Sequence, residues 1–311
     1  MLNWLRPVVG LFVHPDSTPA RASRQKTSGI CGLVCMCSGL RAINPRLPSV
    51  VTDTLKPTTN APVWTDQSLR DPHGSSDKPE KVRAMFSAIA RSYDLNNRLH
   101  SFWQDQRWRR VAVAMADVKP GEIVADVACG TGDLTEAFAR TDAAQIIGLD
   151  FTPAMLELAE HKRQTRPIPA RERIRYIEAD AMDLPLESAS VDVVSIAFGI
   201  RNVADPGKAL AEFARVLKPG GRLVVLEFDR PKLAPVRWFN AFYAGWVMPR
   251  TATWISRDRS GAYRYLPRSV GAFMSRESFS ELLSSSGFEH VRSRGLSLGI
   301  VRLYSGVRSA R

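Results

Sequence analysis

The stretch EIVADVACGTGD, residues 122–133, decides the fold class. Its first eight residues form a short apolar run, which is typical of a strand buried on both faces of a sheet. Gly130 and Gly132 allow a tight turn, and a helix is predicted directly after it at 133–140. A strand, a glycine-containing turn and a helix in this order are typical of α/β folds that bind a nucleotide-like ligand.

Strand and helix patterns alternate on both sides of this unit. Buried strands are predicted at 145–150, 173–180, 191–198 and 222–228. Helices are predicted at 82–91, 103–116, 153–164, 208–217 and 276–285, and a closing antiparallel pair of strands at 288–294 and 298–304. The alternation indicates an α/β fold with a mostly parallel sheet and helices on both faces.

The chain divides near residue 79. Eight of its 20 prolines fall in residues 1–78, together with many Ser and Thr residues and no apolar period long enough for a packed element. We interpret residues 1–78 as a disordered N-terminal extension, or as the product of a start codon placed too far upstream. Residues 79–311 are predicted to form one domain.

Acidic residues stand at the predicted ends of three successive strands. In a parallel sheet these ends meet at one edge, where ligands bind. We expect Asp150 to accept the ribose hydroxyls of an adenosine group, and Asp180 with Ala181 to meet the adenine. The alternative, in which the carboxylates only cap helices or turns, stays open. The predicted cofactor-binding residues are Asp126, Gly130, Thr131, Gly132, Asp150, Asp180 and Ala181.

The details of the turn favour one cofactor over another. The third glycine of a dinucleotide-binding fingerprint is absent, because Leu134 and Thr135 follow Gly132 and Asp133. A K-P-G-G turn at 218–221 precedes the last long strand of the parallel set. Both features favour S-adenosyl-L-methionine over NAD.

Several longer motifs carry a resemblance to a known family. They are GTGD at 130–133, FGIRNV at 198–203, RVLKPGGRLVVLEF at 215–228, YRYL at 263–266 and GIV at 299–301, with Tyr93, Asp94, Asn97, Ser101 and Trp108. Over residues 79–306 the chain resembles the class I methyltransferases that C-methylate menaquinone and ubiquinone precursors. The resemblance implies a Rossmann-like sheet of seven strands, S-adenosyl-L-methionine as methyl donor and a polyprenyl quinol as acceptor. The acceptor is expected to be demethylmenaquinol, with a polyprenyl methoxy-benzoquinol as the alternative.

Such a transfer has simple chemical requirements. A sulfonium methyl group needs alignment with a nucleophile in a water-poor pocket, and it needs no metal. A quinol carbon becomes nucleophilic when its neighbouring hydroxyl approaches phenolate, which a cation stabilises. Arg201, Asn202 and Tyr263 are therefore candidate catalytic residues, and Tyr93 and His100 could also orient or deprotonate the quinol. Alternatively, Arg201 and Asn202 only fix their loop through hydrogen bonds to its backbone.

Positive charge and aromatic residues gather in the last quarter of the chain. Residues 230–311 hold 14 Lys and Arg against four Asp and Glu. A helical aromatic and basic insert is predicted at about 231–265. Its stretch WFNAFYAGWVMPRTATW at 238–254 is either a plain packed helix or an apolar cover for a polyprenyl chain, with arginines meeting lipid phosphates. We therefore expect a cytoplasmic protein that is peripherally associated with the inner face of the membrane. The four cysteines, which form no disulfide pattern, indicate a reducing compartment.

Other functions fit parts of the sequence. A nucleic-acid methyltransferase would use the basic surplus, but the N-P-P-aromatic turn of enzymes that methylate base amines is replaced by FGIRNV at 198–203. No nucleic-acid partner is therefore expected. A non-catalytic cofactor-binding scaffold of a quinone-biosynthesis complex, and a methyltransferase for another phenol or lipid, stay open. A homodimer is compatible with each of these functions.

Overall fold

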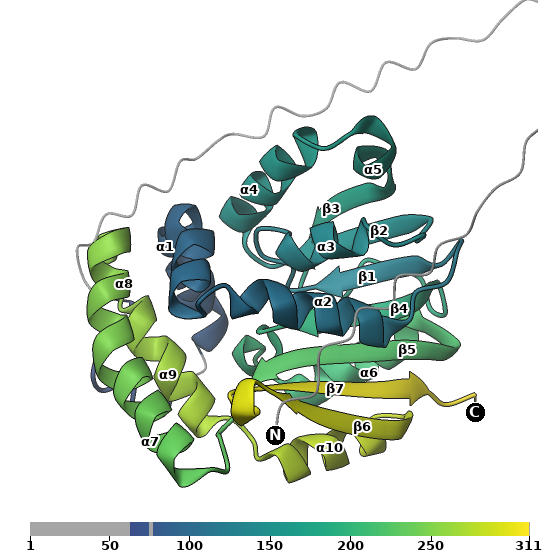
Figure 1. Ribbon diagram of the computed structural model, residues 1–311. Helices are drawn as coiled ribbons and strands as arrows, with labels where there is room; N and C mark the ends of the chain where they lie inside the picture. The colour runs from purple at the N-terminus through teal and green to yellow at the C-terminus, as the bar shows by residue number, and fades with distance from the viewer. Residues whose placement is uncertain (1–62, 75–76, 311) are drawn as a thin grey trace, which may run out of the picture. The chain divides into compact units, whose positions relative to one another are not determined.

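The computed structural model describes residues 63–74 and 77–310, with a seven-stranded sheet at their centre (Figure 1). The strands are β1 Ile123–Val127, β2 Gln145–Asp150, β3 Ile174–Glu178, β4 Val191–Ala197, β5 Leu217–Phe228, β6 Phe288–Leu296 and β7 Val301–Arg308. Their order in the sheet is β3-β2-β1-β4-β5-β7-β6. The first five strands are parallel, and β7 runs antiparallel to both β5 and β6. The predicted sheet with its closing antiparallel pair is therefore confirmed.

The position of a ligand site follows from this order. The chain winds outward from β1 to β3 and then returns to place β4 on the other side of β1, so that Val127 lies beside Ile196. The carboxyl ends of β1 and β4 thus flank the point where the strand order reverses. In open α/β sheets, ligands bind at this point.

Two apolar cores lie on the two faces of the sheet. On one face, helices α2 Gln104–Ala116 and α3 Asp133–Phe138 bury Trp108, Leu134 and Phe138. On the other face, α6 Pro206–Val216 and α10 Arg276–Ser285 bury Phe213 and Phe279. The remaining segments along the sheet are α4 Pro153–Gln164, α5 Ile168–Arg173, η1 Ile200–Asn202 and η3 Ser297–Gly299. Helices on both faces agree with the sequence prediction.

The packed part of the chain begins before the boundary that the sequence suggests at residue 79. Trp64 and Leu69 are 0% and 2% exposed, and they belong to a third core with α1 Lys78–His100 and the helices of the insert. Residues 1–62, where the rest of the predicted extension and three of the four cysteines fall, lie outside the described residues. The segment 63–74 therefore belongs to the folded domain.

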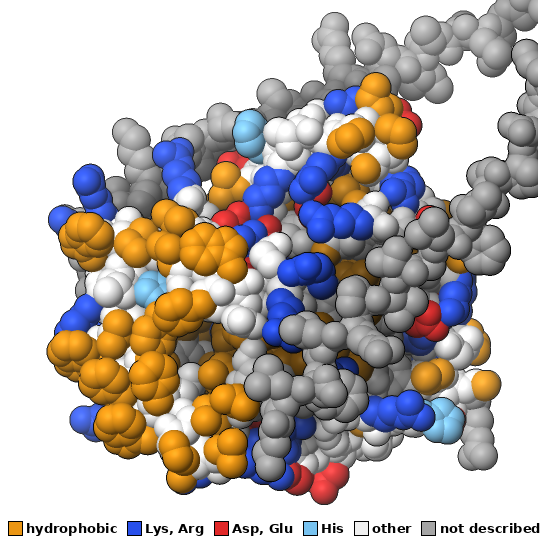
Figure 2. Space-filling view, in the orientation of Figure 1, with side chains coloured by type: hydrophobic (Ala, Val, Ile, Leu, Met, Phe, Trp, Pro, Cys, Tyr) orange, Lys and Arg blue, Asp and Glu red, His pale blue; other side chains and the backbone are white. Residues whose placement is uncertain are grey.

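The predicted insert is helical and reaches further than expected. Helix α7 Ala234–Phe242 continues without a break through the π-helical turn η2 Tyr243–Val247 into α8 Met248–Ser256. Helix α9 Ala262–Ala272 follows and packs against α8. Apolar side chains gather on the surface over α7 and α8, at the left of Figure 2. None of the helices in the described part of the chain has the length and apolar character needed to cross a bilayer.

Candidate functional site

A cavity of about 90 Å³ lies at the carboxyl ends of β1, β2 and β4. Two of the predicted cofactor residues, Gly130 and Asp150, line it together with Asn202. Apolar side chains form most of its remaining wall: Val82, Phe86, Phe151, Met155 and Phe198. We call this space the glycine-loop cavity.

A second cavity of about 80 Å³ adjoins the first. Asp180 and Ala181, which follow β3, line it, and it shares Val82 and Asn202 with the glycine-loop cavity. We call it the Asp180 cavity. Both spaces are smaller than the roughly 300–1,000 Å³ of most small-molecule sites, and α1 forms a wall of each. Helix α1 is thus a cover over this edge of the sheet.

The glycines of the loop after β1 have different roles. Gly132 has a φ of +82°, and a Cβ atom placed on it would lie 2.3 Å from the Tyr176 hydroxyl oxygen. Gly130 has a φ of +56°, with no atom within 4 Å of such a Cβ. Only glycine adopts these conformations without strain. Gly132 therefore permits tight packing within the protein, whereas Gly130 leaves open space beside the cavity.

Two non-glycine residues on the cavity wall also have left-handed backbone. Ala128 has a φ of +50° and Phe198 a φ of +59°. An L-residue in this region costs roughly 1–2 kcal/mol. The loops after β1 and β4 therefore both carry backbone strain where they face the glycine-loop cavity.

Asp150 lies where the sequence predicts it, at the end of β2 and on the cavity wall. Its Oδ2 accepts a hydrogen bond from the Gly130 backbone N–H at 2.7 Å, and its Oδ1 accepts one from the Thr152 N–H at 2.8 Å. Burial raises the pKa of Asp150, although these backbone donors favour the charged form. The Thr152 side chain and the Phe151 backbone N–H also donate to this carboxylate, so Asp150 holds the loop after β2 as well as lining the cavity.

Asp126 is placed differently from the prediction. It lies within β1, is 0% exposed and lines neither cavity. Its carboxylate accepts hydrogen bonds from the hydroxyls of Thr135 at 2.7 Å and Ser195 at 2.8 Å. Asp126 therefore ties β1 to α3 and β4 inside the protein, and it does not face the space that a cofactor could enter.

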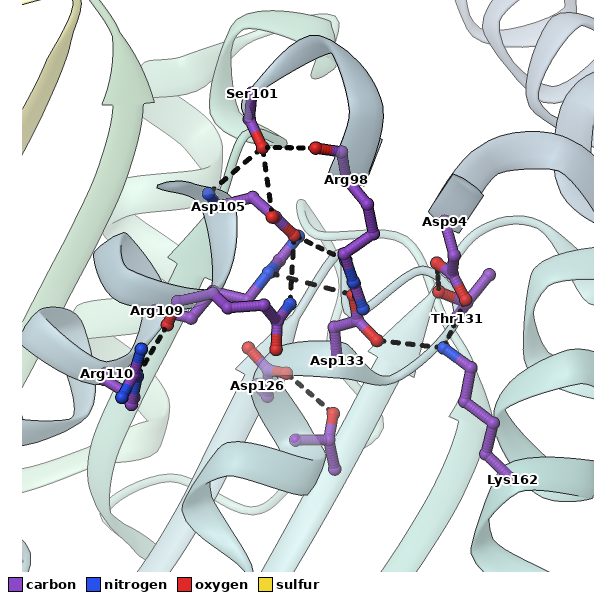
Figure 3. A network of polar contacts seen from close by, with 12 residues as sticks. Asp94, Arg98, Ser101, Asp105, Arg109, Arg110, Asp126, Thr131, Asp133 and Lys162 are labelled. Atoms are coloured by element: carbon purple, nitrogen blue, oxygen red, sulfur yellow. Dashed lines mark hydrogen bonds and ion pairs between the residues drawn. The ribbon is translucent and has the colours of Figure 1, made fainter. Parts of the chain in front are cut away.

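A network of charged side chains joins α1 to the glycine loop and α4 (Figure 3). Thr131 donates from its hydroxyl to Asp94 Oδ1 at 2.6 Å, and Lys162 Nζ lies 2.5 Å from Asp94 Oδ2 and 2.9 Å from Asp133 Oδ1. Arg98 Nη2 donates to Asp133 Oδ2 at 2.7 Å. Although burial opposes ionisation, the neighbouring cations Arg109, Lys162 and Arg98 lower the pKa of Asp133 to about 2.

This network was not predicted, apart from Thr131. It fixes the cover α1 against the loop that carries the predicted cofactor residues. Asp94 and Arg98 are four residues apart and lie on one side of α1, but the helix predicted from the sequence ends at residue 91. Their partners are also far away in the sequence.

Arg201 is buried, and its side chain donates to three groups of the protein. Its Nη1 donates to Glu227 Oε1 at 2.5 Å and to the Phe198 carbonyl at 2.8 Å, and its Nε donates to Ser269 Oγ at 3.3 Å. Arg201 is 3% exposed and lines neither cavity. The structure thus favours the alternative reading, in which Arg201 fixes the loop after β4.

Asn202, in contrast, lines both cavities. Its Oδ1 accepts a hydrogen bond from the Tyr265 hydroxyl at 3.0 Å, and its Nδ2 donates to the Phe198 carbonyl at 3.3 Å. A carbonyl can only accept, so these two contacts fix which way the amide points. A second N–H of Asn202 stays available for a ligand oxygen.

Of the three other predicted side chains, one lines a cavity and two do not. Tyr93 lines the glycine-loop cavity, and burial raises its pKa, so that its hydroxyl is protonated at neutral pH. Tyr263 is 4% exposed, accepts a hydrogen bond from Asn96 at 2.7 Å and lines neither cavity. His100 Nδ1 lies 2.9 Å from the Tyr243 hydroxyl, also outside both cavities, and burial lowers its pKa. Of these three, only Tyr93 is placed to touch a ligand.

The model of the ubiE/COQ5 methyltransferase family matches residues 75–308. The chain belongs to this family. The match covers most of the described residues of this methyltransferase, but it excludes the segment 63–74.

Relatives of this methyltransferase carry two kinds of name. The ubiquinone/menaquinone biosynthesis C-methyltransferase UbiE of Syntrophotalea carbinolica is 44% identical over 231 residues, which are 74% of this chain and 95% of that protein. The demethylmenaquinone methyltransferase of Thermus thermophilus is 44% identical over 225 residues, 72% of this chain and 100% of that protein. The resemblance inferred from the motifs is confirmed.

Solved structures share the fold. The cyclase SpnF has a TM-score of 0.55 at 17% identity, covering 75% of this chain and 96% of its own. A SAM-dependent methyltransferase of Thermotoga maritima, described as a possible histamine N-methyltransferase, has a TM-score of 0.50 at 19% identity, covering 73% and 99%. These identities are too low to compare functions. The predicted class I, Rossmann-like fold of this methyltransferase is confirmed.

Proposed function

We propose that this methyltransferase transfers a methyl group from S-adenosyl-L-methionine to a ring carbon of demethylmenaquinol, giving menaquinol, S-adenosylhomocysteine and the proton that the ring carbon loses. One observation carries the proposal beyond family membership. At the carboxyl edge of the sheet, Gly130 and Asp150 face a largely apolar wall that also presents Asn202. Although the space of about 90 Å³ is smaller than most small-molecule sites, polar residues beside apolar side chains are the lining that a nucleotide-like donor next to an aromatic acceptor requires. Relatives with both kinds of name are equally similar, so the alternative acceptor is a polyprenyl methoxy-benzoquinol.

The residues at this edge fit the donor. Gly130 leaves open space beside the cavity, and Asp150 places a carboxylate on the cavity wall that would accept from ribose hydroxyls. Asp180 and Ala181 line the adjoining cavity, where an adenine ring would lie in our proposal. The bound donor would supply an activated sulfonium methyl group. The protein would hold it with Gly130, Asp150 and Asp180 and exclude water with the side chains of α1.

Two side chains would contact the acceptor quinol. Tyr93 and Asn202 both line the glycine-loop cavity, and in this proposal the protonated hydroxyl of Tyr93 and the second N–H of Asn202 would contact the quinol oxygen. Donors of this kind stabilise the negative charge that develops on a quinol oxygen as its ring carbon becomes nucleophilic. In this proposal Arg201 and Tyr263 support the loop and the cover, and they touch neither substrate.

We also propose that the protein works at a membrane surface. Trp238, Phe242, Trp246, Arg250 and Trp254 recur every fourth residue along the helical run 234–256, and the four aromatic residues are between 47% and 82% exposed. The rings of Trp238 and Phe242, and of Phe242 and Trp246, are stacked, and Arg250 lies 4.5 Å from the Trp246 ring centroid. We call these five residues the aromatic ridge.

The charges around the aromatic ridge suit an anionic bilayer. Residues 230–257 contain five Lys and Arg and no Asp or Glu. Exposed aromatic residues insert at the headgroup level, and each nearby basic residue adds about 1 kcal/mol on anionic lipid. Helix α8 packs against α1, the cover of both cavities. A quinol with a polyprenyl chain would thus reach the site from the bilayer.

The test of the reaction uses the full chain. It is incubated with methyl-labelled S-adenosyl-L-methionine and either reduced demethylmenaquinone or a polyprenyl methoxy-benzoquinol. We expect label in the menaquinone product, and an Asn202→Leu variant should lose turnover while it still binds the donor. Label in the benzoquinol alone would assign the alternative. If the protein binds the donor but labels neither lipid, the proposed methyl transfer is wrong, and the alternative of a non-catalytic scaffold remains.

A further inference from the structure

The segment 63–74, which we call the strap, lies outside the family match and is bound tightly to α9. Trp64 is fully buried, and its ring stacks on that of Tyr265 with 4.1 Å between centroids and 23° between planes. The backbone N–H of Trp64 donates to the Ser260 carbonyl at 3.1 Å. Further along the strap, Asp66 forms an ion pair with Arg264, and His73 Nε2 lies 2.9 Å from the Ser269 carbonyl.

Helix α9 connects the strap to the loop after β4. The Tyr265 hydroxyl donates to Asn202 Oδ1 at 3.0 Å. One turn further along the helix, Ser269 Oγ accepts from Arg201 Nε at 3.3 Å. The side chains that hold Asn202 and Arg201 in place thus come from the helix that the strap covers.

The stack with Trp64 restricts the movement of the Tyr265 hydroxyl, which is the group that contacts Asn202. Rotation about the Cα–Cβ bond of a tyrosine swings the ring and carries the hydroxyl with it, whereas rotation about the Cβ–Cγ bond leaves the hydroxyl oxygen on the axis. Trp64 closes one face of the ring, and Lys81 Nζ of α1 lies 5.7 Å from the Trp64 ring centroid. Tyr265 is 0% exposed, so its ring has no solvent into which to turn. Its hydroxyl is therefore fixed at the Asn202 amide.

We propose that Trp64 is a positioning residue for methyl transfer, which acts through Tyr265 to fix the amide of Asn202 toward the quinol. This inference rests on the proposed function. Trp64 touches neither cavity and acts only by keeping the Tyr265 hydroxyl on Asn202 Oδ1. Without the stack, the amide can turn, and the N–H that faces the quinol oxygen is lost for part of the time.

The test compares four single variants of the full chain: Trp64→Ala, Trp64→Phe, Tyr265→Phe and Leu69→Ala. Leu69 is the matched control, because it is equally buried in the strap and has no stacking contact with Tyr265. Trp64→Ala and Tyr265→Phe should each lower kcat about tenfold, the loss expected for one orienting hydrogen bond. The dissociation constant of S-adenosyl-L-methionine should stay unchanged. Trp64→Phe should restore most of kcat, and Leu69→Ala should leave it unchanged below the melting temperature.

A double variant separates positioning from general support. If Trp64 acts through Tyr265, adding Trp64→Ala to Tyr265→Phe should lower kcat no further. Additive losses would overturn the inference. Should Trp64→Ala fail to fold, Trp64→Leu, which fills the space without an aromatic stack, takes its place in the comparison.

A second measurement does not depend on activity. The side-chain amide resonance of Asn202, assigned by NMR, should shift or broaden in Trp64→Ala and Tyr265→Phe and stay in place in Leu69→Ala. An unchanged resonance in Trp64→Ala would overturn the inference even if kcat fell. If the parent protein methylated neither quinol, the proposed function would fail, and this resonance would still decide the role of Trp64.

Discussion

Arg201 and Glu227 form an ion pair over 2.5 Å in which the side chains are 3% and 2% exposed. Removing one partner of such a pair leaves an uncompensated buried charge and costs about 3–5 kcal/mol. We predict that Arg201→Gln and Glu227→Gln each lower the free energy of unfolding by this amount and abolish turnover, as measured by urea denaturation and label transfer.

A double variant reveals whether Arg201 also takes part in the chemistry. Arg201→Met with Glu227→Leu removes both charges and should regain most of the lost stability. If turnover returns with stability, Arg201 only supports the loop, as we expect. Recovered stability without turnover would give Arg201 a direct role.

Asp126 makes stability depend on pH. Burial raises its pKa to about 6, although hydrogen bonds from Thr135 and Ser195 favour the charged form. The folded state thus binds more protons than the unfolded state, in which an Asp has a pKa of about 3.9. Its contribution to stability is full below about pH 3.9 and is lost as the pH rises through about 6. Asp126→Asn should remove this dependence, which amounts to at most about 3 kcal/mol.

Two measurements check this prediction. Urea denaturation between pH 4 and 7 should show a smaller decline for Asp126→Asn than for the parent. Calorimetry should show that this variant binds S-adenosyl-L-methionine normally, whereas Asp150→Asn binds it weakly. A loss of donor binding in Asp126→Asn would restore Asp126 as a cofactor ligand.

Gly132 should not tolerate a side chain. Gly132→Ala places a Cβ 2.3 Å from the Tyr176 hydroxyl oxygen at a φ of +82°. Gly121 has a φ of +87° with no atom within 4 Å, so Gly121→Ala has the backbone strain without the clash. We predict a larger fall in melting temperature and weaker donor binding for Gly132→Ala. Adding Tyr176→Phe should recover part of the loss, and equal effects of the two alanines would contradict the packing argument.

The aromatic ridge should control binding to lipid. Replacing Trp238, Trp246 and Trp254 by alanine should strongly reduce co-sedimentation with vesicles containing phosphatidylglycerol. The same change at Ile168 of α5, an exposed apolar residue outside the ridge, is the control. Neutral phosphatidylcholine vesicles should bind the parent less well. If the parent is a dimer that the three substitutions dissociate, and vesicle binding is unaffected, the ridge is instead a contact between two copies.

The strap should be needed for stability. A chain that begins at residue 75 lacks the buried side chains of Trp64 and Leu69, and burial of one such side chain contributes roughly 2 kcal/mol. It should melt at a lower temperature than a chain that begins at residue 63. Equal melting temperatures would mean that residues 63–74 add nothing to the fold.

The fold was largely predictable because its signals are local. The apolar runs that became β1, β2 and β4 and the glycine turn after β1 depend on neighbouring residues only. Trp64 escaped prediction because the strap has no periodic pattern. Its ring is buried against Tyr265 of α9, and this contact joins residues that are far apart in the sequence.

The candidate site was less predictable because it depends on faces and partners. Side chains alternate between the two faces of a strand, so the position of Asp126 within β1 decides where its carboxylate points. Arg201 could be recognised as a cation after β4, but its partner Glu227 lies 26 residues later. The sequence therefore predicted where the loops of the site lie, but it did not predict which charged residues form pairs there.

The left-handed backbone of Ala128 and Phe198 has a practical consequence for engineering. Ala128→Gly would relieve roughly 1 kcal/mol of strain and should be selected in a screen for heat resistance. The same change would make the loop after β1 more flexible where it faces the glycine-loop cavity. We therefore expect the variant to be more stable to heat and to have a lower kcat. The methyl group of Ala128 would then lower thermal stability and raise kcat at the same time.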